Sequence, residues 1–273
     1  MQAPTSWSPP SGTLGRIIEE TRERVARLRE RLGDLERAAR DAPAGPSFLA
    51  GLTAGTDVSV IAEVKRRSPS KGTLNAAIDP PAQAAAYRDG GARAISVLTE
   101  ERHFGGSPAD LEKIRGAIGI PLLKKDFHVD ISQIFEARAL GASAVLLIAR
   151  AVAPALLGQL AAAARELGLE PLVEIRDERQ LASALDAGAC AIGVNSRNLE
   201  SLEIDPAVCA RLIPLVPTGC VAIFESGVAN RGDVERAAML GADAVLVGSA
   251  LSTAPEPAAA VRALVGVPRA SRG

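Results

Sequence analysis

The segment "VSVIAEVKRRSPSKG", residues 58–72, carries two ionisable side chains at the end of an apolar run. Glu63 and Lys65 lie two residues apart, and because side chains alternate between the two faces of a strand, both point to the same side as Ile61. Burying an unpaired charge is costly, so one interpretation is a structural ion pair at the end of a strand. The other is a reaction site, in which a carboxylate and an ammonium exchange protons with a substrate.

The rarity of lysine directs attention to the lysines that remain. The chain has 31 basic residues, of which only those at positions 65, 71, 113, 124 and 125 are lysine. An ammonium can be tuned to give up a proton, whereas a guanidinium stays charged. This usage singles out Lys65 and Lys125 as candidates for acid–base chemistry.

Four similar segments reveal a repeat that places these residues on strands. They are "GARAISVLT" from Gly91, "GASAVLLIA" from Gly141, "GACAIGVNS" from Gly188 and "GADAVLVGS" from Gly241. Each glycine fits the C-terminal cap of a helix that leads into a strand. Each interval has room for two βα units of about 25 residues. The intervening strands are expected in "VSVIAEVK", "PLLKKDF", "PLVEIRD" and "CVAIFES".

Eight strands that alternate with helices between residues 58 and 265 predict an α/β fold of the (β/α)8 TIM-barrel type. A doubly wound sheet is the alternative, but it usually breaks its spacing and often opens with GxGxxG, and neither feature is found. Apolar residues from Leu14 to Leu35 recur at helical spacing, which predicts an amphipathic helix that covers part of the barrel or, less simply, forms a short coiled-coil dimer. The predicted organisation is a flexible N-terminus (1–13), an N-terminal helical extension (14–50), the barrel (51–266) and a flexible tail (267–273).

The composition narrows the classes of partner. A net charge of −1 provides no basic surface for nucleic acid, and the N-terminus has neither the basic start nor the apolar run of a signal peptide. The longest apolar stretch is interrupted by Pro154 and Gln159 and is too short to span a membrane. Cys190, Cys209 and Cys220 have no metal-ligand spacing and are expected to be reduced core residues. We therefore expect a cytoplasmic protein, a monomer, with no metal, no other cofactor, no nucleic acid and no membrane among its partners.

The C-terminal ends of the expected strands carry a ring of polar and ionisable groups, at the positions where this fold places its chemistry. They are Glu63, Lys65, Lys125, Glu174, Asn195 and Glu225. Taken singly, a charge at a strand end often pairs with a helix residue. Several such groups that converge on one rim would desolvate one another at a high cost, which favours a functional site.

Small residues follow the last two expected strands, in "ESG" (225–227) and "VGS" (247–249). They expose backbone N–H groups in loops that commonly bind phosphate in this fold, although ordinary turns would look similar. His103 and His128 are expected at the surface or behind the residues that touch a substrate. No HxH or carboxylate–histidine cluster suggests a metal.

These residues, together with the segments around them, make the sequence closely resemble the indole-3-glycerol phosphate synthase family. The most specific matches are "AEVKRRSPS" and "NSRNLE", and "SVLTEERHFGGS", "PLLKKDF", "GASAVLLIA", "PLVEIRD", "FESGV" and "VLVGSAL" extend the resemblance over residues 61–251. The resemblance implies a carbon–carbon lyase that acts on a small phosphosugar. It closes the ring of 1-(2-carboxyphenylamino)-1-deoxyribulose 5-phosphate with loss of carbon dioxide and water.

The resemblance also implies roles for individual residues. Lys125 resembles the acid of ring closure, and Glu174 the acid and base of dehydration. Lys65 resembles a second ammonium near the phosphate, fixed by Glu63, while Asn195 and Glu225 orient polar groups of the substrate. Further substrate contacts are expected from Ser68, Pro69, Phe104, Phe127, Leu146, Arg197 (facing the anthranilate carboxylate), Leu199 and Ser226, and phosphate contacts from Lys65, Gly227, Gly248 and Ser249.

Two alternatives remain at the level of sequence. Another phosphate-binding barrel enzyme, such as a phosphoribosylanthranilate isomerase, shares "GS" after the last strand but would lack Glu63 and Lys65 in combination with Lys125. A non-catalytic phosphosugar-binding barrel would bind ligand without turnover.

Overall fold

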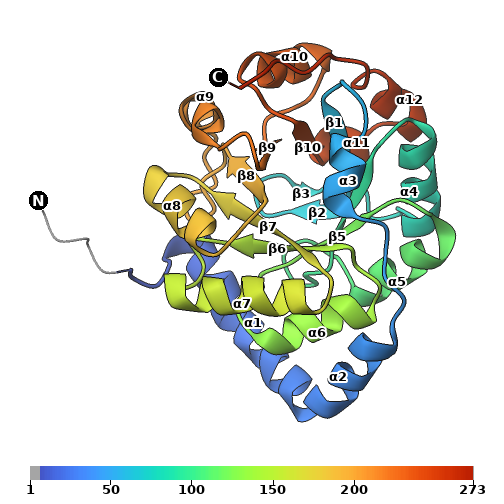
Figure 1. Ribbon diagram of the computed structural model, residues 1–273. Coiled ribbons are helices and arrows are strands. Elements are labelled where there is room, and N and C mark those ends of the chain that lie inside the picture. The colour runs from blue at the N-terminus through green and yellow to red at the C-terminus, as the bar shows by residue number, and fades with distance from the viewer. Residues whose placement is uncertain (1–6, 273) are drawn as a thin grey trace, which may run out of the picture.

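A closed barrel of eight parallel strands forms the centre of the computed structural model, which describes residues 7–272 of the 273-residue chain (Figure 1). Its strands are β1 (Ser59–Val64), β4 (Ala94–Leu98), β5 (Leu122–Lys125), β6 (Ala144–Ile148), β7 (Glu170–Ile175), β8 (Ala191–Asn195), β9 (Val221–Glu225) and β10 (Ala244–Val247). Each strand pairs with its neighbours in chain order, and β1 pairs with both β4 and β10, which closes the barrel. The predicted (β/α)8 fold is confirmed.

Helices surround the barrel and begin at strong start signals. They are α4 (Pro80–Asp89), α5 (Pro108–Ala117), α6 (Ile131–Ala139), α7 (Pro154–Glu166), α8 (Glu178–Asp186), α9 (Pro206–Leu212), α10 (Arg231–Met239), α11 (Ser249–Ser252) and α12 (Pro257–Arg262), with a 3₁₀ turn at Ile213–Leu215. Most of them open with proline, whose fixed φ suits the first helical position, or after a side-chain cap such as Asp130 or Asn230. The four repeated glycines have φ between 72° and 104°, as the predicted caps require. Within residues 7–272, no helix is both long and apolar enough to cross a membrane.

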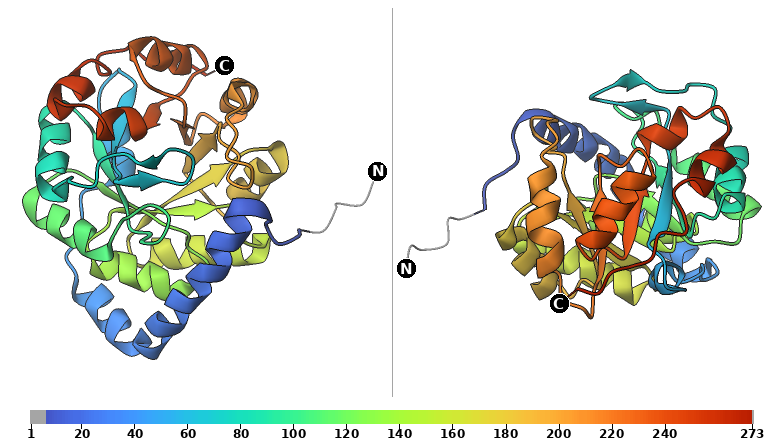
Figure 2. Two further views of the ribbon diagram at one scale, coloured as in Figure 1. Left: turned by 180° about the vertical axis from the view of Figure 1, so that it is seen from behind. Right: turned by 90° about the horizontal axis from the view of Figure 1, so that it is seen from above.

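The N-terminal extension forms three helices, α1 (Gly12–Glu30), α2 (Leu32–Asp41) and α3 (Phe48–Thr53). The single predicted helix is interrupted at Arg31, where φ is −113° and ψ is 17°. The break lets α2 pack against α6, and α1 lies along the barrel at its C-terminal end (Figure 2). The prediction that the extension covers part of the barrel is confirmed. The hairpin of β2 (Arg67–Ser68) and β3 (Gly72–Thr73) projects from the same end (Figure 2).

Both ends of the described chain are hydrogen-bonded to the barrel, although the sequence predicts flexible segments there. The backbone N–H of Ser11 donates to Glu200 Oε1 at 2.6 Å, and residues 1–6 of the predicted N-terminal segment lie outside the described residues. In the tail, the carbonyl of Val267 accepts from Val58 N–H at 2.8 Å, and the buried Arg272 donates to two carbonyl oxygens. Composition alone does not reveal such long-range contacts.

The cysteines correct one further expectation. Cys209 is buried, but Cys220 is half-buried and Cys190 is exposed. Cys190 and Cys220 directly precede β8 and β9, so they lie in turns at the N-terminal end of the barrel rather than in its core.

Candidate active site

A cavity of about 450 Å³ opens at the C-terminal ends of the strands and gathers nearly all the residues that the sequence singled out. The predicted residues that line it are Glu63, Lys65, Ser68, Pro69, Phe104, Lys125, Phe127, Leu146, Glu174, Asn195, Arg197, Leu199, Ser226, Gly227, Gly248 and Ser249. Glu225 does not line the cavity; it is 1% exposed and contacts the cavity through Lys125. Residues from strands far apart in the sequence therefore meet at one site.

Lys125 stands between two carboxylates. Its Nζ lies 3.0 Å from Glu225 Oε2 and 3.5 Å from Glu63 Oε2. Burial disfavours the ammonium, but the charges of Glu225 and Glu63 outweigh burial and raise the pKa of Lys125. The side chain is therefore a charged ammonium that can donate hydrogen bonds into the cavity.

Glu63 also pairs with Lys65, at 2.6 Å between Oε1 and Nζ. Burial favours the neutral carboxyl, but Lys65 and then Lys125 outweigh it and lower the pKa of Glu63. Glu63 thus bridges two ammonium groups, and the side chain of Lys65, 13% exposed, lines the cavity. The ion pair is present and belongs to a larger set of charges around an open site.

Glu174 differs from Glu63 in the direction of its pKa shift. Burial, followed by the charge of Glu225, raises the pKa of Glu174 to about 8, although Lys125 and a hydrogen bond with Asn195 act in the opposite direction. At neutral pH the side chain is a carboxylic acid. A protonated acid and a charged ammonium therefore face the same cavity, an arrangement suited to acid–base catalysis.

The loop after β8 is organised by Asn195 and Arg197. Asn195 Oδ1 accepts from the backbone N–H of Arg197 at 2.9 Å, and the Arg197 guanidinium donates to the carbonyl of Leu202 at 2.8 Å. Burial lowers the pKa of Arg197, which still remains a cation. The cavity therefore has a positive group in the loop after β8.

The corner between β9, β10 and β1 combines unusual backbone with close packing. Ser226 and Gly227 have φ of 67° and 82°, and for serine this left-handed conformation is strained. A Cβ atom on Gly248 would clash with Glu63 Oε1 and would lie 2.8 Å from Lys65 Nζ. The next residue, Ser249, begins α11, and the first N–H groups of a helix have no partner within the helix. Exposed N–H groups and an ammonium thus converge here, as an anion site requires.

Apolar side chains that follow β4 and β5 form another part of the lining. The rings of Phe104 and Phe127 are tilted against each other, with centroids 6.0 Å apart. The sequence did not identify Thr13 and Ile17 of α1, which also line the cavity. The helical pattern identifies the apolar face of α1, but no local signal shows that the face reaches the mouth.

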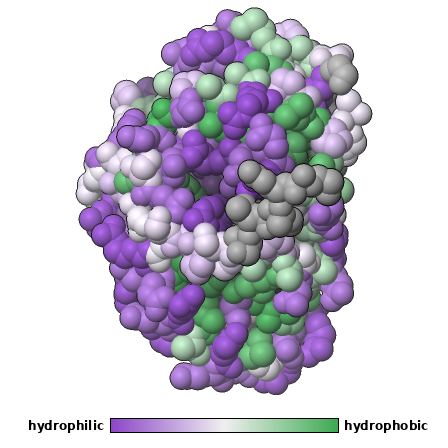
Figure 3. Space-filling view, turned by 90° about the vertical axis from the view of Figure 1, so that its left-hand side faces the viewer, coloured by the Kyte–Doolittle hydropathy of each residue, from purple (hydrophilic) through white to green (hydrophobic). Residues whose placement is uncertain are grey.

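A smaller cavity of about 230 Å³ adjoins the first and shares Ile148, Glu174 and Leu199 with it. Its other lining residues include Arg150, Arg176 and Gln180. On the side of the molecule that carries α7 and α8, Figure 3 shows a hollow surrounded mainly by hydrophilic residues.

Solved structures resemble this chain in fold. A 3-hexulose-6-phosphate synthase from Salmonella typhimurium superposes with a TM-score of 0.62 at 18% identity, over 76% of this chain and 96% of that chain. A thiamine phosphate pyrophosphorylase from Pyrococcus furiosus gives a TM-score of 0.58 at 15% identity, over 79% and 95% of the two chains. At these identities the likeness shows the barrel fold alone.

Similarity in sequence is much closer to one family. The chain is 48% identical over 254 residues to the indole-3-glycerol phosphate synthase of Streptomyces griseus, covering 92% of this chain and 94% of that protein. It is 50% identical over 235 residues to the indole-3-glycerol phosphate synthase of Kineococcus radiotolerans, covering 84% and 85%. A model of the same family matches residues 14–264. The chain belongs to the indole-3-glycerol phosphate synthase family.

Proposed function

We propose a division of roles among the side chains of the cavity for the reaction of this family. The chain carries the family activity, that of a carboxy-lyase of tryptophan biosynthesis that forms indole-3-glycerol phosphate. The substrate is 1-(2-carboxyphenylamino)-1-deoxyribulose 5-phosphate. The observation that carries the proposal is the convergence of a charged lysine and a protonated glutamate on one cavity.

In the first step, Lys125 acts as the acid of ring closure. As the aromatic carbon attacks the substrate carbonyl, negative charge develops on the carbonyl oxygen and must be neutralised. The ammonium of Lys125 supplies a proton, and Glu225 and Glu63 hold it in the mouth at 3.0 Å and 3.5 Å. The aromatic carboxylate then leaves as carbon dioxide, which restores the electron pair to the ring.

In the second step, Glu174 acts in dehydration. The hydroxyl formed by ring closure leaves as water and needs a proton, which the neutral carboxyl of Glu174 can give. The resulting carboxylate can then accept the proton that the ring loses. Asn195, which hydrogen-bonds to Glu174, orients the side chain for both transfers.

The remaining residues bind and orient the substrate. Lys65, fixed by Glu63, and the loops at Gly227 and Gly248 face the phosphate. Arg197 faces the anthranilate carboxylate, and Phe104 and Phe127 pack against the aromatic ring. The remaining predicted contacts are Ser68, Pro69, Leu146, Leu199, Ser226 and Ser249.

We further propose that the protein works as a cytoplasmic monomer that binds no nucleic acid. One chain supplies the whole lining of the cavity described above, so a single copy suffices for the chemistry. The near-neutral net charge of −1 supports the absence of a nucleic-acid partner.

The experiment that tests the proposal measures indole fluorescence during turnover by Lys125→Arg. Arginine keeps the charge but does not release a proton, so kcat should fall by roughly two to four decades, while KM changes far less. Lys113→Arg, the same substitution at an exposed position of α5, is the matched control and should leave kcat unchanged. Near-normal turnover by Lys125→Arg would exclude Lys125 as the acid.

A further inference from the structure

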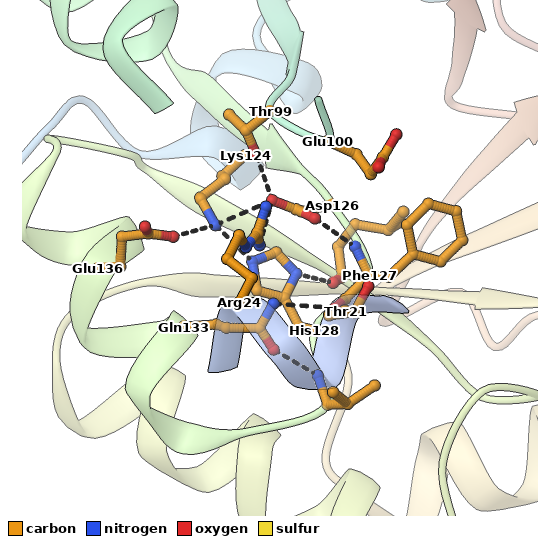
Figure 4. Close-up of polar contacts among 12 residues, drawn as sticks. Thr21, Arg24, Thr99, Glu100, Lys124, Asp126, Phe127, His128, Gln133 and Glu136 are labelled. Atoms are coloured by element: carbon orange, nitrogen blue, oxygen red, sulfur yellow. Dashed lines mark hydrogen bonds and ion pairs between the residues drawn. The ribbon is translucent and has the colours of Figure 1, made fainter. Parts of the chain in front are cut away.

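A second cluster of charges lies beside Lys125, and of its members Asp126 also lines the cavity, whereas Arg24, Lys124 and Glu136 do not. Because side chains alternate along β5, Lys124 points away from the mouth, into the layer between the barrel and helices α1 and α6, and Asp126, which follows β5, lies 3.3 Å from it (Figure 4). Both side chains are 0% exposed. Lys124 and Asp126 are thus buried charges on either side of Lys125, and buried charges must be compensated by partners.

The charges in this cluster balance. Lys124 Nζ lies 2.9 Å from Glu136 Oε2 of α6 and 3.3 Å from Asp126 Oδ2, and Arg24 of α1 donates to Asp126 Oδ2 at 2.7 Å. Two cations therefore face two carboxylates. Without Arg24, the buried carboxylate of Asp126 would have to share Lys124 with Glu136.

The neighbouring histidine adds no charge. His128 Nδ1 lies 2.7 Å from the carbonyl of Leu146 and so carries a hydrogen, while Nε2 accepts from Lys124 at 3.4 Å. Burial, together with the charge of Lys124, lowers the pKa of His128 to about 3. The imidazole is neutral at physiological pH, which leaves Lys124 and Arg24 as the cations that compensate Asp126.

Asp126 in turn fixes the backbone that carries the mouth residues. Its Oδ1 accepts from the backbone N–H of Phe127 at 2.8 Å, and its Oδ2 accepts from the Thr99 hydroxyl. The backbone N–H of Thr99 donates to the carbonyl of Lys125 at 3.1 Å. The carboxylate therefore holds the chain on the C-terminal side of Lys125, next to the residue that forms the aromatic wall.

We propose that Arg24 and Asp126 are positioning residues for ring closure, so that docking of α1 and alignment of the Lys125 ammonium are coupled. The inference rests on the proposed role of Lys125. Helix α1 also contributes Thr13 and Ile17 to the cavity. The same helix therefore lines the cavity and, through Arg24, binds Asp126, the residue that follows Lys125. Neither positioning residue needs to touch the substrate for this effect.

A second ion pair between α1 and the segment after β5 offers a matched control. Arg29, five residues further along α1, donates to Asp130 Oδ2 from Nη2 at 2.5 Å and from Nε at 3.0 Å, and Asp130 caps α6. The Arg29 side chain is 66% exposed, whereas that of Arg24 is 15% exposed. Arg29→Gln thus removes an ion pair between α1 and the region after β5 without changing any contact of Asp126.

The test compares steady-state kinetics and melting curves of Arg24→Gln, Arg24→Lys and Arg29→Gln. For Arg24→Gln we expect kcat to fall roughly ten- to hundredfold, because a shift of about 1 Å in a catalytic group has effects of this size, with KM changing less than about threefold. Arg24→Lys keeps a cation beside Asp126 and should recover most of kcat. Arg29→Gln should keep kcat within about twofold of the parent, with a smaller loss of melting temperature because its ion pair is exposed.

A double-mutant cycle with Asp126→Asn supplies the second readout. If the two residues act as a unit, the doubly substituted protein should lose no more kcat than the worse single variant. Normal kcat for folded Arg24→Gln, or a loss confined to KM, would overturn the inference. An inactive Lys125→Arg with a normal Arg24→Gln would contradict only the coupling between Arg24 and Lys125. An active Lys125→Arg would contradict the proposed catalytic role of Lys125 itself, on which the coupling rests.

Discussion

Glu174 makes the stability of the protein depend on pH. Its pKa is raised from 4.5 to about 8, first by burial and then by Glu225. Between these two pH values the folded protein binds a proton that the unfolded chain has lost. The contribution of Glu174 to the stability of the folded protein is therefore greatest below about pH 4.5, and it is lost as the pH rises to about 8.

Glu174→Gln removes this dependence, because the amide carries no charge at any pH. At about pH 9 the variant should melt higher than the parent by roughly 4 to 8 °C, equivalent to on the order of 2 kcal/mol, and at about pH 5 the difference should shrink toward zero. Melting curves across this range measure it. Glu112→Gln, at an exposed position of α5, should give a difference that does not vary with pH in this way. An unchanging difference for Glu174→Gln would mean that the buried carboxyl holds no proton.

Among the elements, the junction of β10 and α11 leaves the least room for change. Gly248 lies under the Glu63–Lys65 ion pair, so that any side chain there must displace one of them. The sequence identifies Gly248 through its place after the last strand. It does not show that the side chains of Glu63 and Lys65 lie against Gly248, because that contact joins the first and last strands of the barrel, which are far apart in the sequence.

Gly248→Ala should therefore damage the site with little effect on folding. We expect kcat/KM to fall at least about tenfold, equivalent to roughly 1.4 kcal/mol, and inhibition by inorganic phosphate to weaken, because Lys65 is displaced from the phosphate corner. Gly158→Ala in α7 is the control, since a Cβ atom there meets nothing within 4 Å, and it should leave kinetics unchanged and raise stability slightly. Unaltered phosphate inhibition in a folded Gly248→Ala protein would place the phosphate elsewhere.

The elements also show what the sequence can and cannot predict. The strands were predictable because each glycine cap and apolar run is a local signal, and alternation along a strand then assigns residues such as Lys125 and Glu174 to the mouth. The break in the N-terminal helix at Arg31 was not predictable, because the apolar spacing continues through it. The Arg24–Asp126 contact was equally hidden, since it joins residues about a hundred positions apart.

Over the whole molecule, one end of the barrel holds the cavity and the other end contributes contacts that stabilise the fold. The C-terminal ends of the strands hold the cavity, while at the N-terminal ends α3 contacts β1, β4 and β9, and the backbone of residues 267–269 is hydrogen-bonded to that of residues 56–58. Arg272 is 5% exposed in its side chain and donates to the carbonyls of Gly241 and Cys220 and to Asp243 Oδ2, each at 2.6 Å. These contacts stabilise the fold far from the cavity.

Arg272→Met should therefore separate stability from activity. Removing the guanidinium leaves two carbonyls and a carboxylate without this donor, so we expect a loss of about 1–3 kcal/mol and a melting temperature several degrees lower. The kcat of the folded protein should not change. Arg262→Met, at an exposed position of α12, is the control. A large loss of kcat in folded Arg272→Met would show that the two ends are coupled.

The central claim is that Lys125 and Glu174 protonate the substrate at different steps. It is tested most directly by a single turnover in which released carbon dioxide and indole product are measured together. Carbon dioxide leaves after ring closure and before dehydration. Glu174→Gln should therefore release carbon dioxide well ahead of indole, and Lys125→Arg should release neither at an appreciable rate. Equal rates of carbon dioxide and indole formation in Glu174→Gln, or parental carbon dioxide release by Lys125→Arg, would contradict the assignment.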